Sequence, residues 1–187
     1  MAVVIAAPAS GSGKTLLSLL LLAWARACGH SIQPFKVGPD YLDPQLLSAT
    51  AGRSCRNLDL NLCGDGWVQR AFHGYAKGAD LALVEGVMGL FDGIGCSQEG
   101  STAAVAHKLG LPVVLVVDAG GQAASLAAVV KGFRDHDPRL QIAGVVLNRV
   151  STDRHRELLS AVLDSIDMPL LGCLPRHDAL DLPSRHL

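Results

Sequence analysis

Short runs of apolar and β-branched residues alternate along the chain with longer stretches whose apolar positions repeat at helical spacing. The short runs predict strands at residues 2–7, 33–37, 80–84, 112–117, 142–147 and 170–174. The longer stretches predict helices at residues 14–28, 65–77, 101–110, 121–134 and 152–166. Strands that alternate with helices of this length are typical of a parallel sheet with right-handed crossovers. We therefore predict an α/β fold with a doubly wound, mainly parallel sheet.

The composition predicts one globular domain over residues 1–187. Hydrophobic residues make up 49% of the 187 residues and charged residues 18%, which excludes a disordered chain and favours a sheet buried on both faces. The longest apolar run, residues 16–25, falls short of the roughly 20 residues that a membrane span needs. We therefore expect neither a disordered chain nor a transmembrane protein.

The charge balance and the cysteines exclude several further classes. The net charge is −1, so we expect no nucleic-acid partner and no anionic membrane surface. No basic segment precedes the first apolar run, so the sequence does not match a signal peptide and a cytoplasmic location is expected. The five cysteines are an odd number without a C-x-x-C pair, which argues against a disulfide framework and a zinc site. We expect reduced thiols that lie mostly in the core.

A phosphate-binding loop is predicted between the first strand and the first helix, where residues 8–15 read PASGSGKT. Its glycines allow backbone N–H groups to surround phosphate oxygens, while Lys14 reaches the β- and γ-phosphates and Thr15 can ligate Mg²⁺. The pattern G-x-x-x-x-G-K-[ST] departs at its first position, which is Pro8. The alternative is a plain turn with a solvated Lys14. The nucleotide-binding residues predicted here are Ser10, Gly11, Ser12, Gly13, Lys14 and Thr15.

Two carboxylates follow the second predicted strand, in the segment KVGPDYLDP at residues 36–44. Ligands of open α/β sheets bind beyond the carboxyl ends of the strands. The prolines stiffen this loop, so Asp40 and Asp43 can be held toward a common point at little cost in entropy. Magnesium prefers such hard oxygens. The alternative is a turn in which Asp43 caps a helix that starts near Pro44.

A third acidic segment, EGVMGLFDG at residues 85–93, ends the third predicted strand. Glu85 occupies the position where a second metal-binding acid of a P-loop enzyme is expected, so we predict metal ligands at Thr15, Asp40 and Glu85. Asp92 lies on a glycine-flanked loop that could meet a second substrate. The alternative for Glu85 is a buried acid that only pairs with Lys14, although buried pairs seldom gain stability.

Polar residues also follow the fourth and fifth predicted strands. Asn148 carries both a donor and an acceptor, which suits the edge of a purine base, and Arg149 could cover its face. Asp118 could bond the phosphate loop or cap a helix. A turn role for Asn148 is the alternative.

With these segments in order, the chain resembles the N-terminal synthetase domain of the cobyrinic acid a,c-diamide synthase family, within the dethiobiotin-synthetase-like P-loop proteins. The segments KVGPDYLDP and EGVMGLFDG are the most specific part of the resemblance, which covers essentially the whole chain. It implies ATP-dependent amidation of the a and c carboxylates of cobyrinic or hydrogenobyrinic acid through acyl phosphates, with Mg²⁺. This reaction belongs to cobalamin biosynthesis.

The resemblance also implies roles for individual residues. Lys14 and Thr15 would hold phosphate and Mg²⁺, Asp92 would help handle the corrin carboxylates, and adenine would lie against Asn148 and Arg149. The implied catalytic residues are Lys14, Asp40, Asp43, Glu85 and Asp92.

Members of that family usually carry a C-terminal glutaminase domain that releases ammonia from glutamine, and we expect no such domain within residues 1–187. No cysteine here has the surroundings of a glutaminase nucleophile. We expect a truncated form or a subunit that takes ammonia from solution or from a glutaminase partner, and residues 182–187 favour truncation. A corrinoid carboxylate is the expected substrate, and a homodimer stays open.

Four alternatives stay open. A partitioning-type switch ATPase shares the fold, but its loop needs an early lysine where this chain has Ala9. Dethiobiotin synthetase would not explain the two acidic loops. A nickel-sirohydrochlorin diamide synthase is not separated cleanly by sequence, and a purely structural nucleotide-binding module is the fourth alternative.

Overall fold

The structure is a computed structural model that describes residues 1–176. Residues 182–187, on which the prediction of a truncation rests, lie outside the described residues. The strands are β1 Ala2–Ala6, β2 Ile32–Val37, β3 Arg56–Leu58, β4 Leu81–Glu85, β5 Val113–Asp118, β6 Ile142–Val150 and β7 Leu170–Pro175. The helices are α1 Lys14–Ala27, α2 Leu42–Ala51, α3 Leu60–Cys63, α4 Asp65–Ala76, α5 Thr102–Leu109, α6 Ser125–His136 and α7 Asp153–Asp164.

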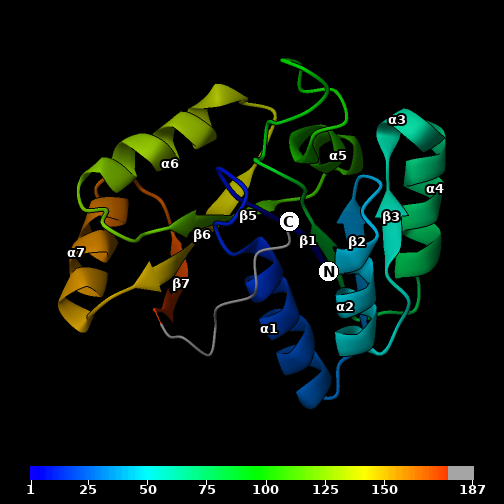
Figure 1. Cartoon of the computed structure of the whole chain (residues 1–187), viewed down its shortest axis with the longest axis horizontal. Helices are drawn as coiled ribbons and strands as arrows, with labels where there is room; N and C mark the ends of the chain where they lie inside the picture. Colours follow the sequence, from blue (N-terminus) through cyan, green and yellow to red (C-terminus); the bar gives the residue numbers. More distant parts are fainter. Residues whose placement is uncertain (177–187) are drawn as a thin grey trace.

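The strands form one seven-stranded sheet in the order β3-β2-β4-β1-β5-β6-β7, and every described pairing is parallel (Figure 1). This confirms the predicted α/β fold. The chain leaves β1 toward β2 on one side, whereas after β4 it crosses β1 to reach β5 on the other side. Such a change of direction leaves a crevice at the carboxyl ends of the central strands, which is where ligands of this architecture bind.

Helices cover both faces of the sheet, as the alternation of side chains along β1 requires. Val4 and Ala6 belong to the larger core cluster, which α4, α5, α6 and α7 complete. Ile5 belongs to the second cluster, beneath α1 and α2. None of the helices described in residues 1–176 is long and apolar enough to cross a membrane.

Three elements were not among the predicted ones. Strand β3 has three residues, of which only Leu58 is buried, so it has too little apolar pattern to detect. Helix α3 has four residues, none of them buried. Helix α2 was only an alternative, because an acid, a proline and few buried apolar positions obscure its period. The predicted core location of the cysteines is wrong, since three are exposed and two are half-buried.

Candidate phosphate and carboxylate site

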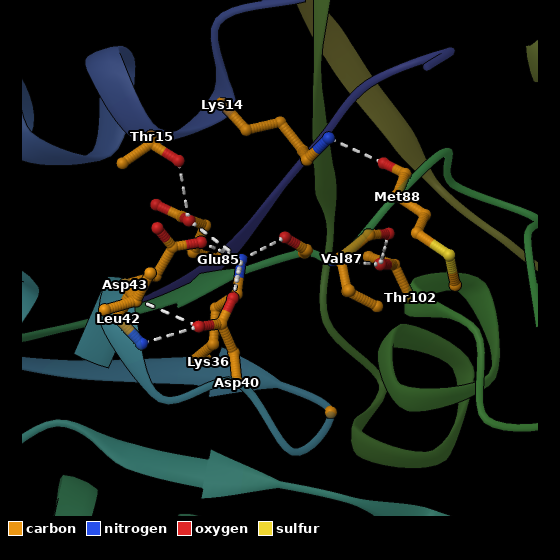
Figure 2. Close-up of polar contacts among 12 residues, drawn as sticks. Lys14, Thr15, Lys36, Asp40, Leu42, Asp43, Glu85, Val87, Met88 and Thr102 are labelled. Carbon is orange, nitrogen blue, oxygen red and sulfur yellow. Dashed lines mark hydrogen bonds and ion pairs between the residues drawn. The ribbon is translucent and has the colours of Figure 1, made fainter. Parts of the chain in front are cut away.

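The candidate site lies where β1, β2 and β4 end, because these strands are neighbours in the sheet. Lys36 of β2 is in register with Glu85 of β4, and Glu85 is in register with Ile5 of β1. The phosphate loop follows β1, so its first helical residues lie close to Glu85. Figure 2 shows side chains from these three segments pointing toward one another.

The phosphate loop takes a conformation that depends on glycine at its tightest point. Gly13 has φ 109°, and a Cβ there would lie 2.4 Å from Asn148 Nδ2. That nitrogen donates to the Ser12 carbonyl oxygen at 3.0 Å, and Ser12 Oγ donates to the Ala9 carbonyl oxygen at 3.0 Å. Helix α1 begins at Lys14 without a side-chain cap. Its N-terminus is therefore built in the way that suits an anion.

Lys14 is buried, with 8% of its surface exposed, and it is held by backbone carbonyl groups. Its Nζ donates to the Met88 carbonyl oxygen at 2.6 Å and to the Ala9 carbonyl oxygen at 3.3 Å. Burial, assisted by repulsion from Lys36, lowers the pKa of Lys14 to about 8, although Glu85 and Asp92 oppose the shift. The cation is thus poorly solvated, which favours contact with an anionic ligand.

Lys36 is the centre of the carboxylate cluster, and sequence reasoning assigned it no role. Its buried Nζ lies 2.8 Å from Asp43 Oδ2, 2.9 Å from Glu85 Oε1 and 3.8 Å from Asp40 Oδ2, and it donates to the Gly86 carbonyl oxygen at 2.9 Å. The only signal in the sequence was a lysine inside a buried strand. The alternative that paired Glu85 with Lys14 is not what the structure shows, since the cation that contacts Glu85 is Lys36.

Asp40 shapes the start of α2 as well as facing Lys36. Its Oδ1 accepts hydrogen bonds from the backbone N–H groups of Leu42 at 2.9 Å and Asp43 at 3.2 Å. A helix does begin beside Pro44, as the alternative expected, but the carboxylate that accepts from its first N–H groups is Asp40 rather than Asp43. Asp43 turns toward the cluster instead.

Thr15 and Glu85 are the two predicted metal ligands that lie in direct contact. Thr15 Oγ1 donates to Glu85 Oε1 at 3.0 Å. Glu85 is fully buried, and its Oε2 has no hydrogen-bond partner in residues 1–176. An orphaned carboxylate oxygen beside a threonine hydroxyl is a donor set that fits Mg²⁺.

Asp40, the third predicted metal ligand, faces Lys36, with its Oδ2 3.8 Å from Lys36 Nζ. Within the described residues, no group of three or more His, Cys, Asp or Glu side chains is arranged to hold a metal ion. An ion held by Thr15 and Glu85 would therefore take its other ligands from phosphate oxygens and water.

Asp92 closes a turn in the loop after β4. Its exposed side chain accepts a hydrogen bond through Oδ2 from the Gly89 N–H at 2.8 Å. A Cβ on Gly89 would lie 2.6 Å from both this oxygen and the Pro8 carbonyl oxygen, so the turn packs tightly against the phosphate loop. The predicted contact of Asp92 with a second substrate stays a prediction.

A groove of about 520 Å³ lies beside the phosphate loop, and Arg149 forms part of its wall. Arg149 Nη1 lies 2.7 Å from Asp118 Oδ2, which joins the ends of β5 and β6. Asp118 therefore bonds Arg149, rather than the phosphate loop as one of the two alternatives expected. Asn148 is buried and gives its amide N–H to Ser12. Its predicted contact with adenine, like that of Arg149, stays a prediction.

A phosphate loop between the first strand and first helix of a parallel sheet defines the class of P-loop nucleotide-binding folds. Solved structures with this fold are similar to the chain. FtsY from Thermotoga maritima has a TM-score of 0.63 at 13% identity, with 98% of this chain and 64% of that chain covered. A nucleotide-binding protein in complex with ADP from Archaeoglobus fulgidus has a TM-score of 0.60 at 13% identity, with 96% and 83% covered. At these identities the likeness shows the fold alone.

The chain belongs to the family of the CobQ/CobB/MinD/ParA nucleotide binding domain, which matches residues 3–187. It is 48% identical over 188 residues to a cobyrinate a,c-diamide synthase from Gloeobacter violaceus, covering 100% of this chain and 42% of that protein. It is 51% identical over 185 residues to a hydrogenobyrinate a,c-diamide synthase from Streptomyces coelicolor, covering 98% and 38%.

These relatives confirm the resemblance that the two acidic loops predicted. The chain spans about two fifths of the length of the curated relatives that it matches.

Proposed function

We propose that this chain is the synthetase part of a cobyrinate or hydrogenobyrinate a,c-diamide synthase, which uses ATP to activate the a and c carboxylates for amidation. Glu85 Oε1 is bonded both to Thr15 of the phosphate loop and to Lys36 of the KVGPDYLDP segment. A phosphate site and a charged cluster of the second loop thus share one buried carboxylate. The names of the relatives supply the substrate class.

The chemistry requires two sites side by side. A carboxylate reacts poorly with ammonia because it carries negative charge and has no good leaving group. A carboxylate oxygen that attacks the γ-phosphorus of ATP breaks the bond to the β-phosphate oxygen, which releases ADP and leaves an acyl phosphate. Ammonia then forms the C–N bond, inorganic phosphate leaves with the C–O electron pair, and the nitrogen loses a proton. Both steps need the carboxylate next to the γ-phosphate.

The residues of this site suit these tasks. Backbone N–H groups of the phosphate loop and Lys14 bind the phosphates. The Lys14 ammonium has three N–H donors, of which two bond the Ala9 and Met88 carbonyl oxygens, so the third can bond a phosphate oxygen. Lys36 neutralises negative charge where the phosphate and the acidic loop meet, and Asp43 orients it. Thr15 and Glu85 would hold Mg²⁺, which neutralises phosphate charge when it is bound. The water-poor surroundings strengthen each of these contacts.

The other residues of the site hold the second loop and bind the substrates. Asp40 fixes the second loop, and Asp92 and its turn face the corrin carboxylates. Adenine binds against Arg149 in the wall of the groove and against the neighbouring Asn148. Ammonia comes from glutamine through a glutaminase outside residues 1–187.

The test measures phosphate release by this chain with Mg·ATP and ammonium. Cobyrinic or hydrogenobyrinic acid should stimulate release, whereas diaminononanoate and nickel-sirohydrochlorin should not. The Lys14→Ala variant, which lacks the phosphate-binding cation, is the control for contaminating ATPase. Stimulation by one of the other acids alone would overturn the corrin assignment.

A further inference from the structure

Thr102, the first residue of α5, holds the loop that follows β4. It is fully buried, and its Oγ1 accepts a hydrogen bond from the Val87 N–H at 2.9 Å while donating to the Val87 carbonyl oxygen at 3.1 Å. A single hydroxyl therefore binds both backbone groups of one residue. A Cβ on Gly86 would lie 2.7 Å from both Thr102 Cγ2 and Oγ1, so the threonine also packs closely against Gly86, the residue before Val87.

The residues on either side of Val87 contact the two buried lysines of the candidate site. The Gly86 carbonyl oxygen accepts from Lys36 Nζ at 2.9 Å, and the Met88 carbonyl oxygen accepts from Lys14 Nζ at 2.6 Å. Figure 2 shows Thr102 and Val87 beside Met88, on the opposite side of Glu85 from Thr15. Rotation of the backbone at Val87 would move both carbonyl groups.

Met88 makes this support necessary, because its backbone is strained. Its φ of 48° is in the left-handed region that a side chain with a Cβ rarely adopts. Such a conformation persists where the surrounding structure fixes it from both sides. Here Thr102 fixes the preceding residue, and Asp92 fixes the following one by accepting from the Gly89 N–H.

We propose that Thr102 is a positioning residue, whose hydroxyl fixes Val87 so that the Gly86 and Met88 carbonyl groups orient Lys36 and Lys14. The effect on nucleotide chemistry rests on the proposed function, since the two lysines act on ATP and a carboxylate only if these bind here. Thr102 itself contacts neither ATP nor the carboxylate. It acts through the main chain of the loop.

The test compares Thr102→Val, which keeps the branched shape but loses the hydroxyl, with Thr102→Ser, which keeps the hydroxyl. Calorimetry measures Mg·ATP affinity, NMR follows the Nζ signals of Lys14 and Lys36 without ligand, and urea unfolding follows stability. Loss of a hydroxyl that makes two hydrogen bonds should weaken ATP binding roughly tenfold in the valine variant. It should also move both lysine signals, whereas the serine variant should stay within roughly twofold of the unchanged protein.

Two results would overturn the proposal. One is a valine variant that loses stability but keeps the ATP affinity and both lysine signals. The other is a serine variant as impaired as the valine variant, because the methyl group rather than the hydroxyl would then matter.

If the unchanged protein binds no Mg·ATP, the proposed function fails, while the lysine signals still decide the positioning role. If the valine variant does not fold, hydrogen exchange of the Val87 amide is measured in the unchanged chain. Slow exchange supports the bond between Val87 and Thr102, and exchange at the rate of an exposed loop contradicts that bond.

Discussion

Lys36 Nζ lies 2.9 Å from Glu85 Oε1, and both side chains are buried at the carboxyl ends of neighbouring strands. Buried ion pairs seldom add to stability compared with apolar packing, because both charges lose their hydration. The pair sits where the phosphate loop and the second acidic loop meet. Its position is therefore better explained by ligand chemistry than by folding.

Replacement of Lys36 by methionine should be strongly destabilising, because it leaves Glu85 and Asp43 buried without their cation. Breaking a buried pair by removing one partner costs roughly 3–5 kcal/mol, to be measured by urea unfolding at neutral pH. The double variant with Glu85→Gln, which removes one of the stranded charges, should recover part of this loss. Equal stability of Lys36→Met and the unchanged protein would show that the lysine does not compensate the cluster.

Binding of ATP should weaken as the pH rises through about 8, where Lys14 loses its proton in the free protein. Phosphate oxygens favour the charged lysine, so the affinity should fall by roughly tenfold for each pH unit above that value. Calorimetry at pH 8.5 in two buffers of different ionisation enthalpy should show proton uptake on binding. A Lys14→Met variant should lack both the uptake and the pH dependence.

The lowered pKa of Lys14 should make the stability of the fold rise with pH, whereas it makes ATP binding weaken with pH. The pKa of Lys14 is 10.5 without the fold and about 8 within it. Between these values the unfolded chain binds more protons, so this lysine should make the free energy of unfolding rise with pH. Urea unfolding from pH 7.5 to 10 checks the sign of this effect: the rise in the free energy of unfolding should be lost in Lys14→Met. A slope identical in both proteins would contradict the burial of this charge.

Thr15→Val should weaken the effect of magnesium on ATP binding, whereas Thr15→Ser, which keeps the hydroxyl, should not. The hydroxyl contacts Glu85, whose second oxygen has no hydrogen-bond partner in residues 1–176. Calorimetric titration of ATP with and without Mg²⁺ measures this effect. If Mg²⁺ raised the ATP affinity of Thr15→Val and Thr15→Ser equally, the metal would have to bind elsewhere.

Asp92→Asn should keep nucleotide binding, because the amide oxygen can still accept from the Gly89 N–H and preserve the turn. Asp92→Ala should weaken nucleotide binding, because it removes the turn contact that holds Met88 from one side, and it should disturb amidation more strongly, because it also removes the charge. The two variants are compared by ATP affinity and by the KM for the corrinoid acid. A normal KM in both variants would remove Asp92 from the substrate site.

The sequence was sufficient to place a functional residue when that residue ends or directly follows a strand. The phosphate loop follows β1, and Glu85 is the last residue of β4, so the rule for parallel sheets placed both correctly at one edge. Contacts between distant segments could not be obtained in this way. Lys36 meets Glu85 only because β2 and β4 pair in a particular register. The bond from Asn148 to Ser12 depends on the same kind of long-range placement.

In the proposed reaction, this chain activates a corrin carboxylate by phosphorylation. This activation is tested most directly with cobyrinic acid whose carboxylates carry ¹⁸O, incubated with the chain, Mg·ATP and ammonium chloride, followed by mass spectrometry of the corrin and of the released phosphate. We predict one or two carboxylate-to-amide conversions, with one ¹⁸O transferred to phosphate for each amide. Phosphate without ¹⁸O and a corrin that keeps all its carboxylates, despite bound ATP, would contradict the account.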